Sequence, residues 1–208
     1  MAAPVIKAVI FDLDGVLVDA CPIHRRTFQQ ACLENGLRVT VANEEALEGR
    51  PTRVKLEMLG VTDPEVAQKI FRRKQELTVE GAFHYPFDPA RVSILTQLQS
   101  DGILLGVYTN SIRATALTFL ASAGLLQFFD VVISNNDVQK PKPNPEGYLK
   151  AIEYFGLRPS EVLAVEDSPV GLEAARLSGA NVLATSYTGL IRDRRVFLGT
   201  INGVSCSS

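Results

Sequence analysis

Short apolar runs alternate with amphipathic stretches along most of the chain, and the two patterns predict different elements. The first run, residues 5–10, is rich in β-branched residues and almost uninterrupted, which is typical of a strand buried on both faces. Later segments predict strands at 103–108, 130–133, 162–165 and 181–184, and helices at 90–100, 111–123, 144–156 and 168–179. Beyond Thr185 the pattern fades, and residues 193–195 are expected to form a solvated turn. Strands that alternate with helices predict an α/β fold with a parallel sheet covered on both faces.

The stretch between the first strand and about residue 85 follows another pattern, because it is polar and helical and contains no strand signal. Helices are expected at 22–35, from Asn43 to about 49, at 52–59, and from 64 to about 81. The last of these begins at Asp63-Pro64, an N-cap followed by a proline at the first helical position. Residues 85–89 are turn-rich and fit a linker. We therefore expect a helical domain at 19–85, inserted into an α/β core made of 1–18 and 86–208.

Composition and charge narrow the range of functions. The 208 residues are 46% hydrophobic, enough for a sizeable core, and the net charge of −2 gives no basic excess for binding nucleic acid. Three scattered cysteines, Cys21, Cys32 and Cys206, lack metal-ligand spacing and fit a reducing compartment, so we expect a cytoplasmic protein. We expect no secretory signal, and no apolar run reaches the length of a membrane span. The sequence thus predicts neither a nucleic-acid nor a membrane partner, and it specifies no oligomeric state.

Two carboxylates directly follow the first predicted strand, in the segment Phe11-Asp12-Leu13-Asp14-Gly15. Side chains two positions apart in an extended chain share a face, so Asp12 and Asp14 can point into one site. Their mutual repulsion is relieved by a divalent cation or by a shared proton. The segment equally fits an Asp-Gly turn at the surface, so it does not distinguish a site from a turn by itself.

The other predicted strands also end in polar residues. In an open parallel sheet, ligands bind at the carboxyl ends of the strands. The later strand ends bring to that edge Thr109-Asn110-Ser111, Asn135-Asn136-Asp137, Lys140 and Lys142, and Glu166-Asp167-Ser168. In phosphoryl transfer, carboxylates serve as nucleophile and as acid–base group, while a lysine and a hydroxyl neutralise phosphate charge. Oxygen ligands favour magnesium, and the chain has no G-x-x-x-x-G-K-[ST] segment that would indicate a nucleotide P-loop.

These strand ends, taken in order, resemble the motifs of the haloacid dehalogenase-like (HAD) superfamily. The matching segments are Asp12-Leu13-Asp14-Gly15, Thr109-Asn110, Lys142-Pro143-Asn144-Pro145-Glu146 and residues 165–171. The resemblance covers most of the chain and implies a Rossmann-like core with an inserted α-helical cap. Lys142 fits the family's K-P-x-P-[DE] spacing, whereas Lys140 lacks an acidic residue at the required offset.

The resemblance also implies a role for each matching residue. Asp12 is the expected nucleophile, and Asp14 is the expected general acid and base. Thr109, Asn110 and Lys142 are expected to bind the phosphate group of the substrate.

The implied cofactor is Mg²⁺, held by Asp12, the backbone carbonyl of Asp14 and Asp167, with Glu166 close by. An acid at position 14 also argues against two branches of the superfamily. The true dehalogenases lack this acid because a halide leaves without a proton, and the phosphonate-cleaving relatives lack it and use a lysine of the cap. The implied partner is therefore a small-molecule phosphate ester, whose leaving oxygen needs a proton.

Within the predicted cap, the chain resembles the β-phosphoglucomutase-like and phosphatase group of the superfamily. The group has a histidine like His24, a glycine and arginine loop like Gly49-Arg50-Pro51-Thr52-Arg53, and a basic cluster like Arg72-Arg73-Lys74. The resemblance implies that His24 lies near the acid–base group and that Arg53 and Lys74 face the substrate. The alternatives are a solvated helix face for the basic cluster, a helix start flanked by arginines, and an ordinary interdomain histidine.

We expect a magnesium-dependent phosphatase that acts on a small phosphorylated metabolite, a sugar phosphate or a similar acid, through an aspartyl-phosphate intermediate. The first alternative is a β-phosphoglucomutase-type isomerase, which would return the phosphate to a second sugar hydroxyl. The second alternative is a non-catalytic domain that binds a phosphorylated metabolite or a protein. The sequence hardly separates the phosphatase from the isomerase, because they differ in whether water reaches the phospho-aspartate.

Overall fold

The structure, a computed structural model, describes residues 5–40, 46–47 and 52–201 of the chain. The chain divides into two compact units. The larger unit contains Met1–Asp19 and Tyr85–Ser208, and the smaller unit contains Ala20–His84. The predicted helix that begins at Asn43 lies outside the described residues, except for residues 46 and 47, which are helical.

The larger unit is built on a parallel sheet with the strand order β3-β2-β1-β4-β5, so the predicted α/β fold is confirmed. The strands are β1 (Ala8–Phe11), β2 (Leu104–Tyr108), β3 (Val131–Ile133), β4 (Val162–Glu166) and β5 (Asn181–Ala184). β1 is the central strand, paired with β2 on one side and β4 on the other, and all of its side chains are buried. β1 begins later than predicted, since Val5 is 72% exposed and precedes the first pair of the ladder, Ala8 with Leu104.

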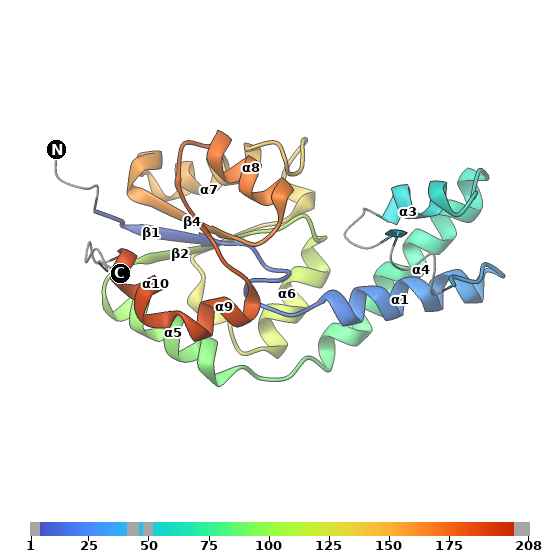
Figure 1. Cartoon of the computed structure of the whole chain (residues 1–208), viewed down its shortest axis with the longest axis horizontal. Helices are drawn as coiled ribbons and strands as arrows, with labels where there is room; N and C mark the ends of the chain where they lie inside the picture. The colour runs from blue at the N-terminus through green and yellow to red at the C-terminus, as the bar shows by residue number, and fades with distance from the viewer. Residues whose placement is uncertain (1–4, 41–45, 48–51, 202–208) are drawn as a thin grey trace. The chain divides into compact units, whose positions relative to one another are not determined.

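Helices cover both faces of this sheet (Figure 1). They are α5 (Pro89–Ser100), α6 (Arg113–Ser122), α7 (Glu146–Phe155) and α8 (Pro169–Leu177), with short 3₁₀ helices at Leu126–Phe128, Asn135–Asp137 and Pro159–Glu161. Because side chains alternate along β1, Ala8 and Ile10 pack into the core beneath α7 and α8. Phe11 points to the other face, where its ring contacts that of Phe197 edge-on. The sheet therefore separates two apolar cores, as a buried parallel sheet requires.

Two further helices follow β5, where no regular element was predicted. They are α9 (Tyr187–Arg192) and α10 (Arg194–Ile201). Ser186 caps α9 by accepting a hydrogen bond from the backbone N–H of Gly189 at 3.3 Å. Of the turn expected at 193–195, only Asp193 lies between the helices, because Arg194 and Arg195 belong to α10. The prediction was wrong because helices of 6 and 8 residues are too short for their apolar positions to repeat.

The smaller unit is helical and has an apolar core of its own, to which Phe28 and Ile70 belong. Its helices are α1 (Cys21–Glu34), α3 (Thr52–Met58) and α4 (Pro64–Phe83). Asp63 caps α4 as predicted, because its carboxylate accepts a hydrogen bond from the backbone N–H of Glu65 at 2.8 Å. None of the helices in the described part of the chain combines the length and the apolar character that a membrane span requires.

Candidate active site

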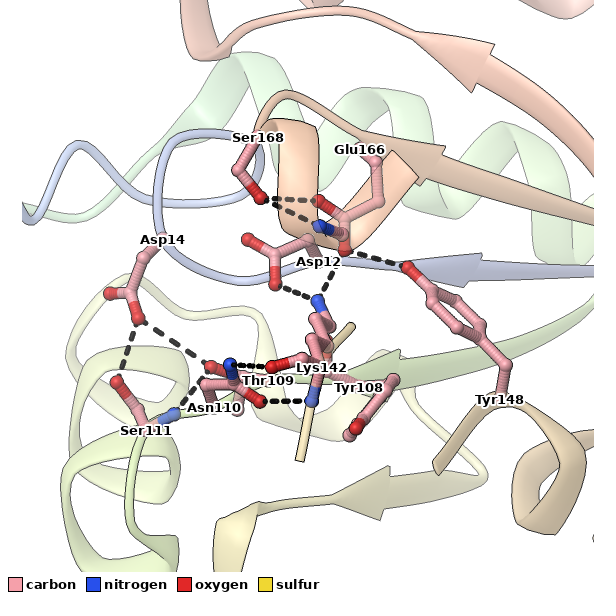
Figure 2. A network of polar contacts seen from close by, with 11 residues as sticks. Asp12, Asp14, Tyr108, Thr109, Asn110, Ser111, Lys142, Tyr148, Glu166 and Ser168 are labelled. Atoms are coloured by element: carbon pink, nitrogen blue, oxygen red, sulfur yellow. Dashed lines mark hydrogen bonds and ion pairs between the residues drawn. The ribbon is translucent and has the colours of Figure 1, made fainter. Parts of the chain in front are cut away.

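The register of the sheet sets the ends of three strands side by side. Phe11, the last residue of β1, is paired with Val107 of β2 and with Val165 of β4. Asp12 continues the ladder by one step, since its backbone N–H donates to the carbonyl of Val165 at 2.9 Å. The residues that follow these strands therefore meet at the carboxyl edge of the sheet, where the sequence predicts a site (Figure 2).

A buried lysine joins the ends of β1 and β4. The Lys142 ammonium lies 2.5 Å from Asp12 Oδ1 and forms a second ion pair with Glu166 Oε1. It also donates to the carbonyl of Tyr108 at 3.0 Å, while the hydroxyl of Tyr148 donates to Glu166 at 2.8 Å. The Lys142 side chain is 3% exposed, so both ion pairs are withdrawn from water. Such a network stabilises the fold only when every member is paired, and here each charged group has at least one partner.

Asn110 places the backbone that carries this lysine. Its side-chain oxygen accepts a hydrogen bond from the Lys142 backbone N–H at 3.0 Å, and its amide donates to the Lys142 carbonyl at 3.4 Å. Asn135 in turn donates to the carbonyl of Asn110 at 3.1 Å. The Asn110 side chain is therefore bonded to the backbone of Lys142. The side chain of Lys140, in contrast, is exposed to solvent.

The carboxylate of Asp14 is held by two hydroxyls from the end of β2. Ser111 Oγ donates to Asp14 Oδ2 at 2.7 Å, and Thr109 Oγ1 lies 3.5 Å from the same oxygen. The Ser111 backbone N–H donates to Thr109 Oγ1 at 3.0 Å, which links the two hydroxyls. The helix predicted at 111–123 begins later in the structure, at Arg113, and its N-cap residue, Ile112, makes no side-chain hydrogen bond to the helix. Ser111 therefore bonds to Asp14 and not to α6.

Gly15 allows the chain to turn sharply after Asp14. Its φ of +94° lies in the region that favours glycine. A Cβ atom at this position would lie only 2.0 Å from Asp167 Oδ2, so no other residue fits without moving that carboxylate. The glycine therefore brings the loop after β1 against the acid that follows β4.

The carboxylates at this edge fit a divalent cation. Asp12, Glu166 and Asp167 each offer an oxygen, and these oxygens lie within 4.8 Å of one another. Burial raises the pKa of Asp12 well above its usual range, and the Glu166 charge adds to this while Lys142 opposes it. Burial and the Glu166 charge also raise the pKa of Asp167 to about 6. One lysine thus does not balance the acids, and an oxygen-only donor set with excess negative charge suits Mg²⁺.

The family profile described as haloacid dehalogenase-like hydrolase matches residues 9–185, which include all of the polar strand ends described above. The chain belongs to this family. The predicted resemblance, and with it the expectation of an enzyme, is confirmed.

Individual relatives of this HAD-family chain support the assignment. The validoxylamine A 7'-phosphate phosphatase of Streptomyces hygroscopicus subsp. limoneus is 32% identical over 181 residues, which are 83% of this chain and 82% of the relative. A phosphoglycolate phosphatase of Nitrosospira multiformis is 31% identical over 190 residues, 88% of this chain and 84% of its own. A solved structure from Thermotoga maritima, provisionally named a β-phosphoglucomutase, is 27% identical, covers 91% of each chain and superposes with a TM-score of 0.67.

The predicted cap residues of this HAD-family chain lie within the smaller unit. Lys74 is 9% exposed, and its ammonium lies 3.3 Å from Nδ1 of His24. Arg53 lies on α3, where its side chain is 89% exposed and pairs with Glu57 at 3.2 Å. The structure thus brings His24 and Lys74 together and gives Arg53 a different neighbour, while Arg50 lies outside the described residues.

Three polar residues of the site were not predicted in their observed roles. Ser111 and Ser168 were placed at the polar strand ends, but neither was expected to contact an acid of the site. Ser168 accepts from the Gly171 backbone N–H at 3.1 Å, and its hydroxyl also lies 3.4 Å from Glu166 Oε2. Tyr148 lies in an apolar stretch of α7 and gave no signal, because a buried tyrosine resembles any other core aromatic.

Proposed function

We propose that this chain is a magnesium-dependent phosphatase that hydrolyses a small phosphorylated metabolite, a sugar phosphate or a similar acid, through an aspartyl-phosphate. The observation that carries this proposal is the buried Lys142 ammonium, which is paired with Asp12 within a cluster of three carboxylates. The names of relatives at 32% and 31% identity, both phosphatases, support the reaction class.

In this mechanism Asp12 is the nucleophile. Its carboxylate attacks the phosphorus, the bond from phosphorus to the ester oxygen breaks, and Asp14 gives a proton to the leaving alcohol. Asp14 then takes a proton from water, which attacks the phosphorus of the aspartyl-phosphate and releases inorganic phosphate. Lys142 favours the charged form of Asp12 and neutralises the phosphoryl oxygens, to which the Thr109 hydroxyl also donates. Ser111 keeps the carboxyl of Asp14 in place for both proton transfers (Figure 2).

The carboxylates would hold the magnesium ion in unequal ways. We assign direct binding to Asp12, Asp167 and the backbone carbonyl of Asp14. Both oxygens of Glu166 already face Lys142, Tyr148 and Ser168, so its role is to hold the lysine and to support the ion indirectly. When bound, the ion supplies positive charge that stabilises the phosphoryl oxygens during transfer.

The smaller unit would serve as the cap, which excludes water and selects the substrate. Lys74 and His24 are the candidate substrate contacts, because Lys74 is a buried cation placed on an imidazole. Arg53 remains a weaker candidate, since it is highly exposed and bonded to Glu57. The same His24 and Lys74 pair also fits the second candidate function, a β-phosphoglucomutase-type isomerase, because the group whose cap it resembles contains both kinds of enzyme.

One assay separates these functions. The protein is supplied with β-glucose 1-phosphate, a sugar bisphosphate primer and magnesium, and both glucose 6-phosphate and free phosphate are followed. A phosphatase releases phosphate and accumulates no glucose 6-phosphate, whereas accumulation of glucose 6-phosphate would establish the isomerase. A panel of phosphorylated metabolites then identifies the substrate. Turnover of neither the panel nor an aryl phosphate would contradict the proposed phosphatase activity.

A further inference from the structure

A fully buried arginine lies outside the chemistry proposed so far. Arg91, on α5, has 0% exposure, and its Nη1 lies 2.6 Å from Asp88 Oδ2. The ring of Tyr187 covers the guanidinium at 3.4 Å, and the Tyr187 hydroxyl donates to the same Asp88 oxygen at 3.0 Å. Burying a charge is expensive, so a position that only filled the core would be better served by an apolar residue. The remaining donors of Arg91 show what the arginine does there.

Those donors converge on the loop that carries Asp14. Nε and Nη2 of Arg91 both donate to the carbonyl of Val16, each at 3.2 Å. The loop is otherwise closed on itself, because the Leu13 carbonyl accepts from the backbone N–H groups of Leu17 and Val18, both at 3.0 Å. The Arg91 guanidinium therefore binds this turn at the Val16 carbonyl. A lysine cannot replace this pair of hydrogen bonds, because it lacks the planar set of donors.

Helix α9, which follows β5, completes the arrangement. Besides covering the guanidinium with its ring, Tyr187 accepts a hydrogen bond from Arg91 through its backbone carbonyl. Its hydroxyl donates to Asp88, which lies just before α5. Arg91 and Tyr187 therefore join three segments of the larger unit: the loop after β1, the segment that precedes α5, and α9.

We propose that Arg91, together with Asp88 and Tyr187, positions the loop from Asp14 to Val18 and thereby the acid–base carboxyl. This inference rests on the proposed function, in which Asp14 protonates the leaving group. The carboxylate of Asp14 is fixed from one side by Ser111, and its backbone is fixed from the other side through Val16 and Arg91. Loosening the backbone anchor impairs proton transfer more than attack by Asp12, because proton transfer needs the donor within hydrogen-bond reach of the leaving oxygen.

Leaving-group dependence tests the proposal. Nitrophenyl phosphate has a leaving group that departs with little help from an acid, whereas the leaving group of phenyl phosphate is a stronger base and needs the proton. For Arg91→Lys we expect kcat/KM for phenyl phosphate to fall about tenfold more than kcat/KM for nitrophenyl phosphate. A purely structural role lowers the amount of active protein, which reduces both values by the same factor and leaves their ratio unchanged.

Three further variants make the outcome decisive. Asp14→Asn should show the same selective loss in larger measure, and Arg192→Lys, an exposed arginine of α9 bonded to Asp193, should leave both values unchanged. Tyr187→Phe keeps the ring over Arg91 but removes the bond to Asp88, and it should show a smaller selective loss, so it serves as the test if Arg91→Lys does not fold.

Equal losses for both substrates in Arg91→Lys and Tyr187→Phe, with a selective loss in Asp14→Asn, would overturn the positioning role and leave the proposed function intact. No selective loss in Asp14→Asn, or no hydrolysis by the unmutated protein, would refute the proposed acid–base chemistry itself and this inference with it.

Discussion

The two edges of the same sheet carry similar ion pairs with opposite consequences. At the amino edge, Lys7 lies just before β1 and its ammonium is 2.7 Å from Glu161, just before β4. At the carboxyl edge, Lys142 bridges Asp12 and Glu166, at the other ends of the same two strands. The Lys7 side chain is 55% exposed, whereas that of Lys142 is 3% exposed. The same pair of strands thus ends in a solvated ion pair on one side and a buried one on the other.

The balance of charge differs even more than the burial. Glu161 has two cationic partners, Arg158 and Lys7, whose hydrogen bonds lower its pKa to about 2. At the carboxyl edge one lysine faces several acids, and burial raises the pKa values of Asp12 and Asp167. A balanced ion pair whose cations lie largely in water needs no ligand, but an unbalanced buried cluster is costly unless a cation or a reaction makes use of it. The imbalance of charge, rather than the presence of an ion pair, therefore distinguishes the site from the amino edge.

The largest expected effect comes from removing the nucleophile. Asp12→Asn should lower kcat for an aryl phosphate by about a thousandfold or more, because the amide cannot form the aspartyl-phosphate. Glu161→Gln, the matched change at the amino edge, should leave kcat and KM within about twofold of the unmutated values. Steady-state kinetics of both variants provide the check, and an active Asp12→Asn variant would refute the mechanism.

The second largest expected effect is on the free energy of unfolding, when one lysine of each edge is replaced. In the presence of a chelator, Lys142→Met should lower the free energy of unfolding by about 3 kcal/mol or more, because two buried carboxylates lose their cation. Lys7→Met should cost much less, since the ammonium it removes is largely in water. Urea unfolding of both variants measures the difference. Equal losses of unfolding free energy would show that the two lysines contribute equally to stability, which would contradict the expected effect of burial.

Magnesium should stabilise the protein through the carboxyl edge of the sheet alone. A ligand that binds only the folded state stabilises it by about 2.7 kcal/mol at 100 times its dissociation constant. We therefore expect magnesium to raise the melting temperature of the unmutated protein and of Glu161→Gln alike, and to raise that of Asp167→Asn much less. The same magnesium-dependent rise in all three proteins would place the ion elsewhere.

The smallest effect concerns the amino edge and its dependence on pH. The folded pKa of Glu161, about 2, lies below its ordinary value of 4.5. Its contribution to stability is therefore complete above the ordinary value and is lost as the pH falls toward the folded one. The difference in unfolding free energy between the unmutated protein and Glu161→Gln should shrink over this range. A difference that stays constant with pH would contradict the assigned pairing.

The sequence was most informative where its signals are local. Buried strands, the Asp63 cap and the polar strand ends are set by neighbouring residues, and the parallel arrangement then brings those ends to one edge. The contributions of Tyr148 and Arg91 were not predictable, because each depends on partners far along the chain. Arg91, for example, lies in a predicted helix, where an arginine is ordinarily expected at the surface, and its buried donors bond to Val16 and Tyr187. Helices α9 and α10 escaped prediction because each is too short to show a period.

Trapping the phosphorylated enzyme tests the role of Asp12 as nucleophile most directly. The protein is mixed rapidly with an aryl phosphate and magnesium, quenched in acid, digested and examined by mass spectrometry. We expect a phosphate on Asp12, formed before free phosphate is released and absent from the Asp12→Asn variant. Steady turnover with no phosphorylated peptide, or with the phosphate on another residue, would contradict the claim that Asp12 is the nucleophile of this site.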